Sequence, residues 1–151
     1  TLSPQNAFYI LNGIETLNLR MKKHTDNALE VASYLQEHPK VSYVSYAGLK
    51  NNKYYDLGKK YFPKGPGSIF TIRLKNGYKA CVSMVENVKL FSHVANVGDT
   101  RSLIIHPAST THSQLSDKEK VKAGAGPDII RLSIGLEDIE DIIIDLENSI
   151  K

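Results

Sequence analysis

A short apolar segment near the C-terminus, residues 129–134, alternates like a β-strand and carries a single charged side chain, Arg131. Side chains of a strand point in turn to the two faces of a sheet. Arg131 therefore shares one face with Ile129 and Ser133. The opposite face receives only apolar side chains, those of Ile130, Leu132 and Ile134.

The segment that follows this strand predicts a helix with one apolar stripe. Its apolar residues recur at helical spacing: Ile139, Ile142, Ile143, Leu146 and Ile150. Such a helix would cover the apolar face of the strand, so Arg131 points away from it. A desolvated guanidinium is unfavourable unless an anion meets it, so either the chain or a ligand must supply that anion. The alternative is an exposed arginine with an ordinary surface partner.

Helical and strand signals alternate along the rest of the chain. Strands are predicted at 41–46, 68–74, 92–95, 102–106 and 129–134. Helices are predicted from Pro4, capped by Ser3 and ended or bent at Gly13; from Thr16 to His38; and within 51–62, 80–88, 116–123 and 138–151. This order favours an α+β, two-layer fold in which a mostly antiparallel sheet of four or five strands carries helices on one face. The other face then needs a cover.

Composition narrows the class of protein. The chain has 151 residues, a net charge of +3 and dispersed lysines, which argues against a nucleic-acid surface. No apolar run is long enough for a membrane span and no signal peptide begins the chain. Cys81 is the only cysteine and has apolar neighbours, so we expect a core residue in a reducing, cytoplasmic setting. Because the chain begins with Thr1, we expect a fragment or a processed product.

The stretch 96–114 is dense in polar groups although it flanks an apolar strand. His106 and His112 could bind a metal, but no third ligand stands at a usual spacing. Ser109, Thr110 or Thr111 beside His112 could form a nucleophile and base, but no nucleophile-elbow pattern is present. A third interpretation is a loop that helps to hold an anion together with Arg131. The fourth is that these residues only cap the ends of strands.

Several strings, in order and with compatible spacing, resemble the C-terminal part of the cysteine/methionine-metabolism family of pyridoxal-phosphate (PLP) enzymes. They are SPQNAF (3–8), GIETL followed by RM (13–21), HPKV (38–41), NVGDTRSLIIHPASTTH (96–112) and RLSIGLED (131–138). The strings NVGDTRSL and HPASTTHSQL are most similar to the O-acetylhomoserine sulfhydrylase branch. Methionine γ-lyases and cystathionine γ-synthases share the last motif, so they remain alternatives, as does a free-standing domain that binds an amino acid or a protein.

The resemblance implies roles for two residues. Arg131 matches the family's arginine that binds the α-carboxylate of the amino-acid substrate, a task suited to the planar guanidinium fork. Asn96 matches a position where many members carry a serine beside that carboxylate, so its role is implied less firmly. No catalytic, cofactor-binding or metal-binding residue is expected in this chain, because nothing in it matches the motif of the lysine that carries PLP.

The resemblance also implies a division into domains. Residues 1–15 would end an interdomain helix, and residues 16–151 would form the small C-terminal domain, with the large PLP-binding domain outside this chain. The full-length enzyme would make L-homocysteine from O-acetyl-L-homoserine and sulfide and would assemble as a tetramer, while the fragment alone would be inactive. The large domain would cover the second sheet face, and in this chain alone Arg131 would meet water or a buffer anion.

Overall fold

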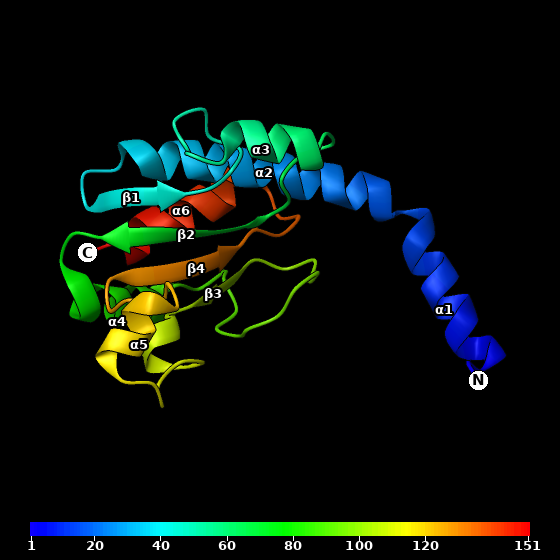
Figure 1. Ribbon diagram of the computed structural model, residues 1–151. Coiled ribbons are helices and arrows are strands. Elements are labelled where there is room, and N and C mark those ends of the chain that lie inside the picture. The colour runs from blue at the N-terminus through cyan, green and yellow to red at the C-terminus, as the bar shows by residue number, and fades with distance from the viewer.

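The computed structural model describes all 151 residues and contains one antiparallel sheet with its main helices on one side (Figure 1). The strands are β1 (Val41–Ser45), β2 (Ile69–Leu74), β3 (Leu103–Ile105) and β4 (Ile129–Ser133). They lie in the order β1-β2-β4-β3, so β4 is a central strand with β2 on one side and β3 on the other. The predicted α+β class is confirmed.

The chain also forms six α-helices and one short 3₁₀ turn. The helices are α1 (Pro4–Glu15), α2 (Leu17–Glu37), α3 (Tyr55–Tyr61), α4 (Gly77–Asn87), α5 (Asp117–Lys122) and α6 (Ile139–Ser149), and the 3₁₀ turn η1 spans Pro107–Ser109. The Ser3 side chain caps α1 by accepting a hydrogen bond from the Asn6 amide at 3.2 Å, as predicted. The helix does not end at Gly13, which was one of the two predicted outcomes there: Gly13 stays within α1, and the two helices separate at Thr16.

The apolar side of the sheet and the helices α2, α4 and α6 form the core. Ile130, Leu132 and Ile134 are each 0% exposed, and Ile142 and Leu146 of α6 are equally buried. The predicted alternation of β4 and the predicted stripe of α6 are thus confirmed. Cys81 of α4 also belongs to this core, and its burial raises the pKa of its thiol to about 12, so the thiol stays protonated.

The strand predicted at 92–95 is wrong. Only a single isolated bridge forms there, between Ser92 and Leu103. The Ser92 amide donates to the Ser102 carbonyl and the Ser92 carbonyl accepts from the Ile104 amide, after which the chain turns away from β3. Residues 93–98 therefore lie on the exposed surface as an irregular loop rather than as a fifth strand.

The second face of the sheet is covered over only part of its width. Near β3 the side chains of Leu103, Ile105 and Ile129 are buried, beneath the segment that contains η1 and α5. Toward β1 the same face is open, because Tyr43 is 48% exposed and Arg73 is exposed as well. Arg131 lies at the boundary between the covered part and the open part.

Helix α1 extends away from the sheet (Figure 1) and has no buried residue. Its five large apolar side chains are all more than half exposed: Phe8, Tyr9, Ile10, Leu11 and Ile14. An apolar surface of this kind is typical of an interface with another part of a protein. None of the helices is both long enough and apolar enough to cross a membrane.

Asp145 of α6 ties this helix to the turn that leads from α4 toward the 93–98 loop. The residue is only 9% exposed, and its carboxylate accepts hydrogen bonds from the backbone amides of Lys89, Leu90 and Phe91 at 2.8, 2.9 and 3.3 Å. A carboxylate that accepts several amides can fix a turn that has no regular structure of its own.

Replacing Asp145 by Ala should therefore destabilise the protein by roughly 1 to 3 kcal/mol, because partly buried amides lose their acceptor. Urea unfolding of the two proteins measures this difference. Asn148→Ala, on an exposed position of the same helix, is the control and should stay within about 0.5 kcal/mol of the parent. Equal stability of the Asp145 variant and the control would mean that the three amides do not depend on the carboxylate.

Candidate functional site

Arg131 stands in the middle of β4 on the incompletely covered face of the sheet. Its neighbours across the sheet are Thr71 of β2 and Ile105 of β3, and Thr71 in turn pairs with Ser45 of β1. The side chains of Ser45 and Thr71 are small, so they leave room above the sheet on the β1 side of the guanidinium. Arg131 itself is half-buried.

The Arg131 guanidinium has one protein acceptor and no protein anion. Its Nη2 donates to the backbone carbonyl of Asn96 at 3.3 Å. None of the ion pairs within 4.0 Å includes Arg131. Two other arginines each have a carboxylate partner, Arg73 with Asp128 at 3.9 Å and Arg101 with Asp99 at 3.3 Å. Arg131 thus presents unused N–H donors next to the open part of the sheet.

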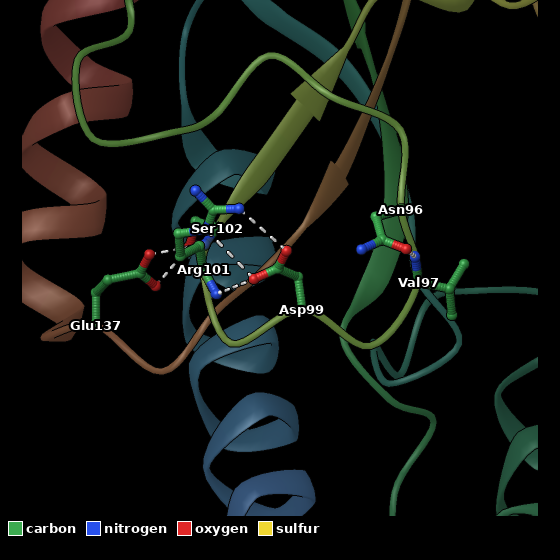
Figure 2. Close-up of polar contacts among 6 residues, drawn as sticks. All are labelled: Asn96, Val97, Asp99, Arg101, Ser102 and Glu137. Carbon is green, nitrogen blue, oxygen red and sulfur yellow. Dashed lines mark hydrogen bonds and ion pairs between the residues drawn. The ribbon is translucent and has the colours of Figure 1, made fainter. Parts of the chain in front are cut away.

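Asn96 begins a tight loop that is organised by its own side chains (Figure 2). The Asn96 side-chain oxygen accepts from the Val97 amide at 2.8 Å, and Gly98 adopts a left-handed φ of 86°. Asp99 accepts from the Arg101 amide at 3.1 Å and also from its guanidinium, and these bonds lower the pKa of the Asp99 carboxyl. The structure therefore brings Asn96 to Arg131, but through the Asn96 backbone carbonyl rather than its amide side chain.

The end of this loop is joined to the turn that follows β4. Glu137 accepts from the Ser102 amide at 2.7 Å and from the Ser102 hydroxyl at 2.9 Å, and that hydroxyl accepts from the Gly135 amide at 2.8 Å. Figure 2 shows the Glu137 carboxylate directed at Ser102. The sequence did not single out Ser102 or Glu137, which lie 35 residues apart and become partners only through the pairing of β3 with β4.

Helix α2 holds the same turn from its other side. The buried His24 bonds through Nδ1 to the Ile134 carbonyl at 2.7 Å, and since a carbonyl can only accept, Nδ1 carries the proton. The Asn27 side chain donates to the carbonyls of Gly135 and Glu137 at 3.1 and 3.0 Å. Helix α2 thus holds three carbonyls of this turn, those of Ile134, Gly135 and Glu137, and supports the end of β4.

The two histidines considered as metal ligands do not form a metal centre. No group of three or more His, Cys, Asp or Glu side chains comes together in the structure. His106 is 1% exposed and uses both ring nitrogens, with the Pro127 carbonyl at 3.0 Å and the Ser109 hydroxyl at 2.9 Å. Burial lowers its pKa, so the ring stays neutral and supports the covering segment. The His112 ring forms a hydrogen bond only with the hydroxyl of its neighbour Thr111.

The chain is similar to known proteins over its whole length. The model of the Cys/Met metabolism PLP-dependent enzyme family matches residues 1–151. The O-acetyl-L-homoserine sulfhydrylase of Leptospira meyeri is 49% identical over 151 residues, which cover 99% of this chain and 34% of that protein. An L-methionine gamma-lyase of Fusobacterium nucleatum is 42% identical over 150 residues, 38% of its length. The chain spans about one third of the length of the curated relatives it matches most strongly.

A solved structure has the same fold. It is described as an O-acetylhomoserine (thiol)-lyase of Campylobacter jejuni and contains a pyridoxyl-lysine phosphate group at position 205 of that protein. The TM-score is 0.91 at 47% identity, and the match covers 99% of this chain and 36% of that one.

The close approach of the two site segments gives a prediction at Gly135. A Cβ at this position would lie 2.5 Å from the carbonyl carbon of Arg101 and would also collide with the Ser102 amide. Gly135→Ala should therefore push the two segments apart and cost roughly 1 to 3 kcal/mol of stability, measured by urea unfolding. Gly13→Ala is the control, because beyond its own stretch of helix nothing lies within 4 Å of its added Cβ. If both variants were as stable as the parent, the packing of Gly135 against Ser102 would be looser than described.

Proposed function

Because the chain belongs to the Cys/Met metabolism family of PLP-dependent enzymes, we propose that it is the substrate-carboxylate-binding part of an O-acetylhomoserine sulfhydrylase. The expected reaction of the full-length enzyme is a γ-replacement. Sulfide takes the place of the acetate group of O-acetyl-L-homoserine, and the products are L-homocysteine and acetate. The curated relatives named as sulfhydrylases at 49% and 48% identity support this choice of reaction.

The observation that carries the proposal is the unused guanidinium of Arg131. Its neighbours toward β1, Thr71 and Ser45, have small side chains, and no carboxylate of the chain forms an ion pair with it. A substrate α-carboxylate would supply the missing anion, because two parallel N–H groups of the fork can bind both of its oxygens. This double contact fixes the rotation of the substrate as well as its position. The Asn96 carbonyl would hold the remaining side of the guanidinium in place.

The residues of this chain do not fit the cofactor itself. None of its lysines is buried, and the only one that is half-buried, Lys120, lies 3.9 Å from Asp117 on the helix α5. When bound in the full-length enzyme, PLP supplies the electron sink for the reaction. We propose that the large domain which binds it lies outside residues 1–151, and that this domain covers the apolar side chains of α1 and the open part of the sheet.

The same proposal gives the domain division. Residues 1–15, which include α1, would end the helix between the domains, and residues 16–151 would form the small domain. The isolated chain would then be inactive, and its partners would be the substrate amino acid, the large domain and further copies of the enzyme in a tetramer. Relatives that are nearly three times as long support this view over a free-standing amino-acid-binding domain.

A test of this function uses the full-length enzyme with its cofactor. Arg131→Ala should lower kcat/KM for O-acetyl-L-homoserine. The loss should correspond to roughly 2 to 4 kcal/mol of transition-state stabilisation, the scale for removing one partner of a desolvated charge pair. Arg131→Lys keeps the charge but loses the planar fork, so its kcat/KM should lie between those of the parent and of Arg131→Ala. An unchanged kcat/KM in Arg131→Ala would remove Arg131 from substrate binding.

Two controls sharpen the test. Arg73→Ala removes an exposed arginine from the same face of the sheet and should leave kcat/KM close to the parent value. The parent enzyme is also assayed with L-methionine alone, the substrate indicated by the name of the relative that is 42% identical. Faster turnover of L-methionine than of O-acetyl-L-homoserine with sulfide would favour a γ-lyase over a sulfhydrylase.

A further inference from the structure

The contacts of the 96–101 loop connect Arg131 with a glutamate that lies outside the substrate site. We propose that Glu137 is a positioning residue: through Ser102 it fixes the 96–101 loop, and the loop fixes the Arg131 guanidinium. This inference rests on the proposed function, because it assigns a role in carboxylate binding. It names Glu137 and Ser102 as residues on which substrate affinity depends although neither bonds to Arg131.

The first step is the bond between Glu137 and Ser102. Both carboxylate oxygens are used, one by the Ser102 amide at 2.7 Å and the other by the Ser102 hydroxyl at 2.9 Å. Ser102 is 0% exposed and its hydroxyl also accepts from the Gly135 amide at 2.8 Å. The hydroxyl must therefore donate its single proton to Glu137. An ionised carboxylate suits this role because it only accepts hydrogen bonds.

The second step is that Ser102, which Glu137 holds, contacts the chain on both sides of the 96–101 loop. The neighbouring backbone bond from the Leu136 amide to the Thr100 carbonyl is 2.8 Å long. Before the loop, the Ser92 amide donates to the Ser102 carbonyl at 3.0 Å and the Ser92 carbonyl accepts from the Ile104 amide at 3.1 Å. Ser102 is thus the residue at which the loop ends and also a partner of the segment that precedes it.

The third step leads from the loop to Arg131. Residues 96–101 have no regular secondary structure, and Val97 is 74% exposed, so packing does little to hold them. Their own bonds, from Val97 to Asn96 and from Arg101 to Asp99, keep the loop's shape, while Glu137 and Ser102 fix its place. The Asn96 carbonyl is then set where the Arg131 Nη2 donates to it. A shift of the loop would release the guanidinium from its only protein acceptor.

The experiment is a double-mutant cycle in the full-length enzyme with its cofactor. Glu137→Gln keeps the size of the side chain but places an NH₂ group where the Ser102 hydroxyl must donate. It should lower kcat/KM for O-acetyl-L-homoserine by roughly tenfold or more, mainly through the KM of that substrate, with little change in the KM of sulfide. In an Arg131→Ala background the same change should have little further effect, because the group that it positions is gone.

Non-additivity separates positioning from a loss of folded enzyme. If Glu137 only supported the fold, its replacement would reduce the active fraction equally in both backgrounds, and the two losses would add. Additive losses, or an unchanged kcat/KM in Glu137→Gln, would overturn the inference. Glu140→Gln is the matched control, an exposed glutamate three residues further on whose side chain makes no hydrogen bond or ion pair, and it should behave as the parent.

A second variant keeps the question decidable if Glu137→Gln does not fold. Ser102→Ala removes only the hydroxyl, and in the same cycle it should show the same dependence on Arg131. Additive losses for Ser102→Ala would also overturn the inference. The proposed function has its own contradicting result, which is an unchanged kcat/KM in Arg131→Ala alone. A large effect of Arg131→Ala without any effect of Glu137→Gln would contradict only the positioning role of Glu137.

Discussion

The pairing of β4 with strands on both of its sides is the interaction on which the site depends. Because β4 is central, its backbone is held by β2 and β3, and its alternation sends Ile130 and Leu132 into the core while Arg131 faces the other way. A shift of β4 by one residue would bury the guanidinium among apolar side chains, at a large cost in free energy. The core therefore fixes the direction of a side chain that does not itself belong to it.

Around this rigid strand the structure places a loop that has little packing of its own. The 96–101 loop is held by local hydrogen bonds and by the contact between Ser102 and Glu137. Glu137 belongs to the turn that follows β4, and helix α2 supports this turn through His24 and Asn27. The arrangement places an irregular but hydrogen-bonded loop beside the guanidinium. A domain that covers the open face would enclose both.

Much of the fold follows from the sequence, because the alternation of β2 and β4 and the stripe of α6 are strong periodic signals. The strand predicted at 92–95 failed for a physical reason: only Ser92 finds partners on β3 before the chain turns toward Asn96. The direction of Arg131 could be predicted from alternation alone. The roles of Ser102 and Glu137 could not, since their contact arises from strand pairing between distant segments. The contact of the Asn96 carbonyl with Arg131 could not be predicted either, because it depends on the path of the irregular loop.

The most direct measurement of the central claim is a crystal structure of the full-length enzyme with a bound amino-acid substrate or unreactive analogue. The Arg131 guanidinium should then donate two hydrogen bonds, each about 2.7 to 2.9 Å long, to the two oxygens of the α-carboxylate. The Asn96 carbonyl should remain beside the guanidinium. A carboxylate bound elsewhere, with Arg131 paired instead to an acidic side chain of the protein, would contradict the claim that this strand holds the substrate.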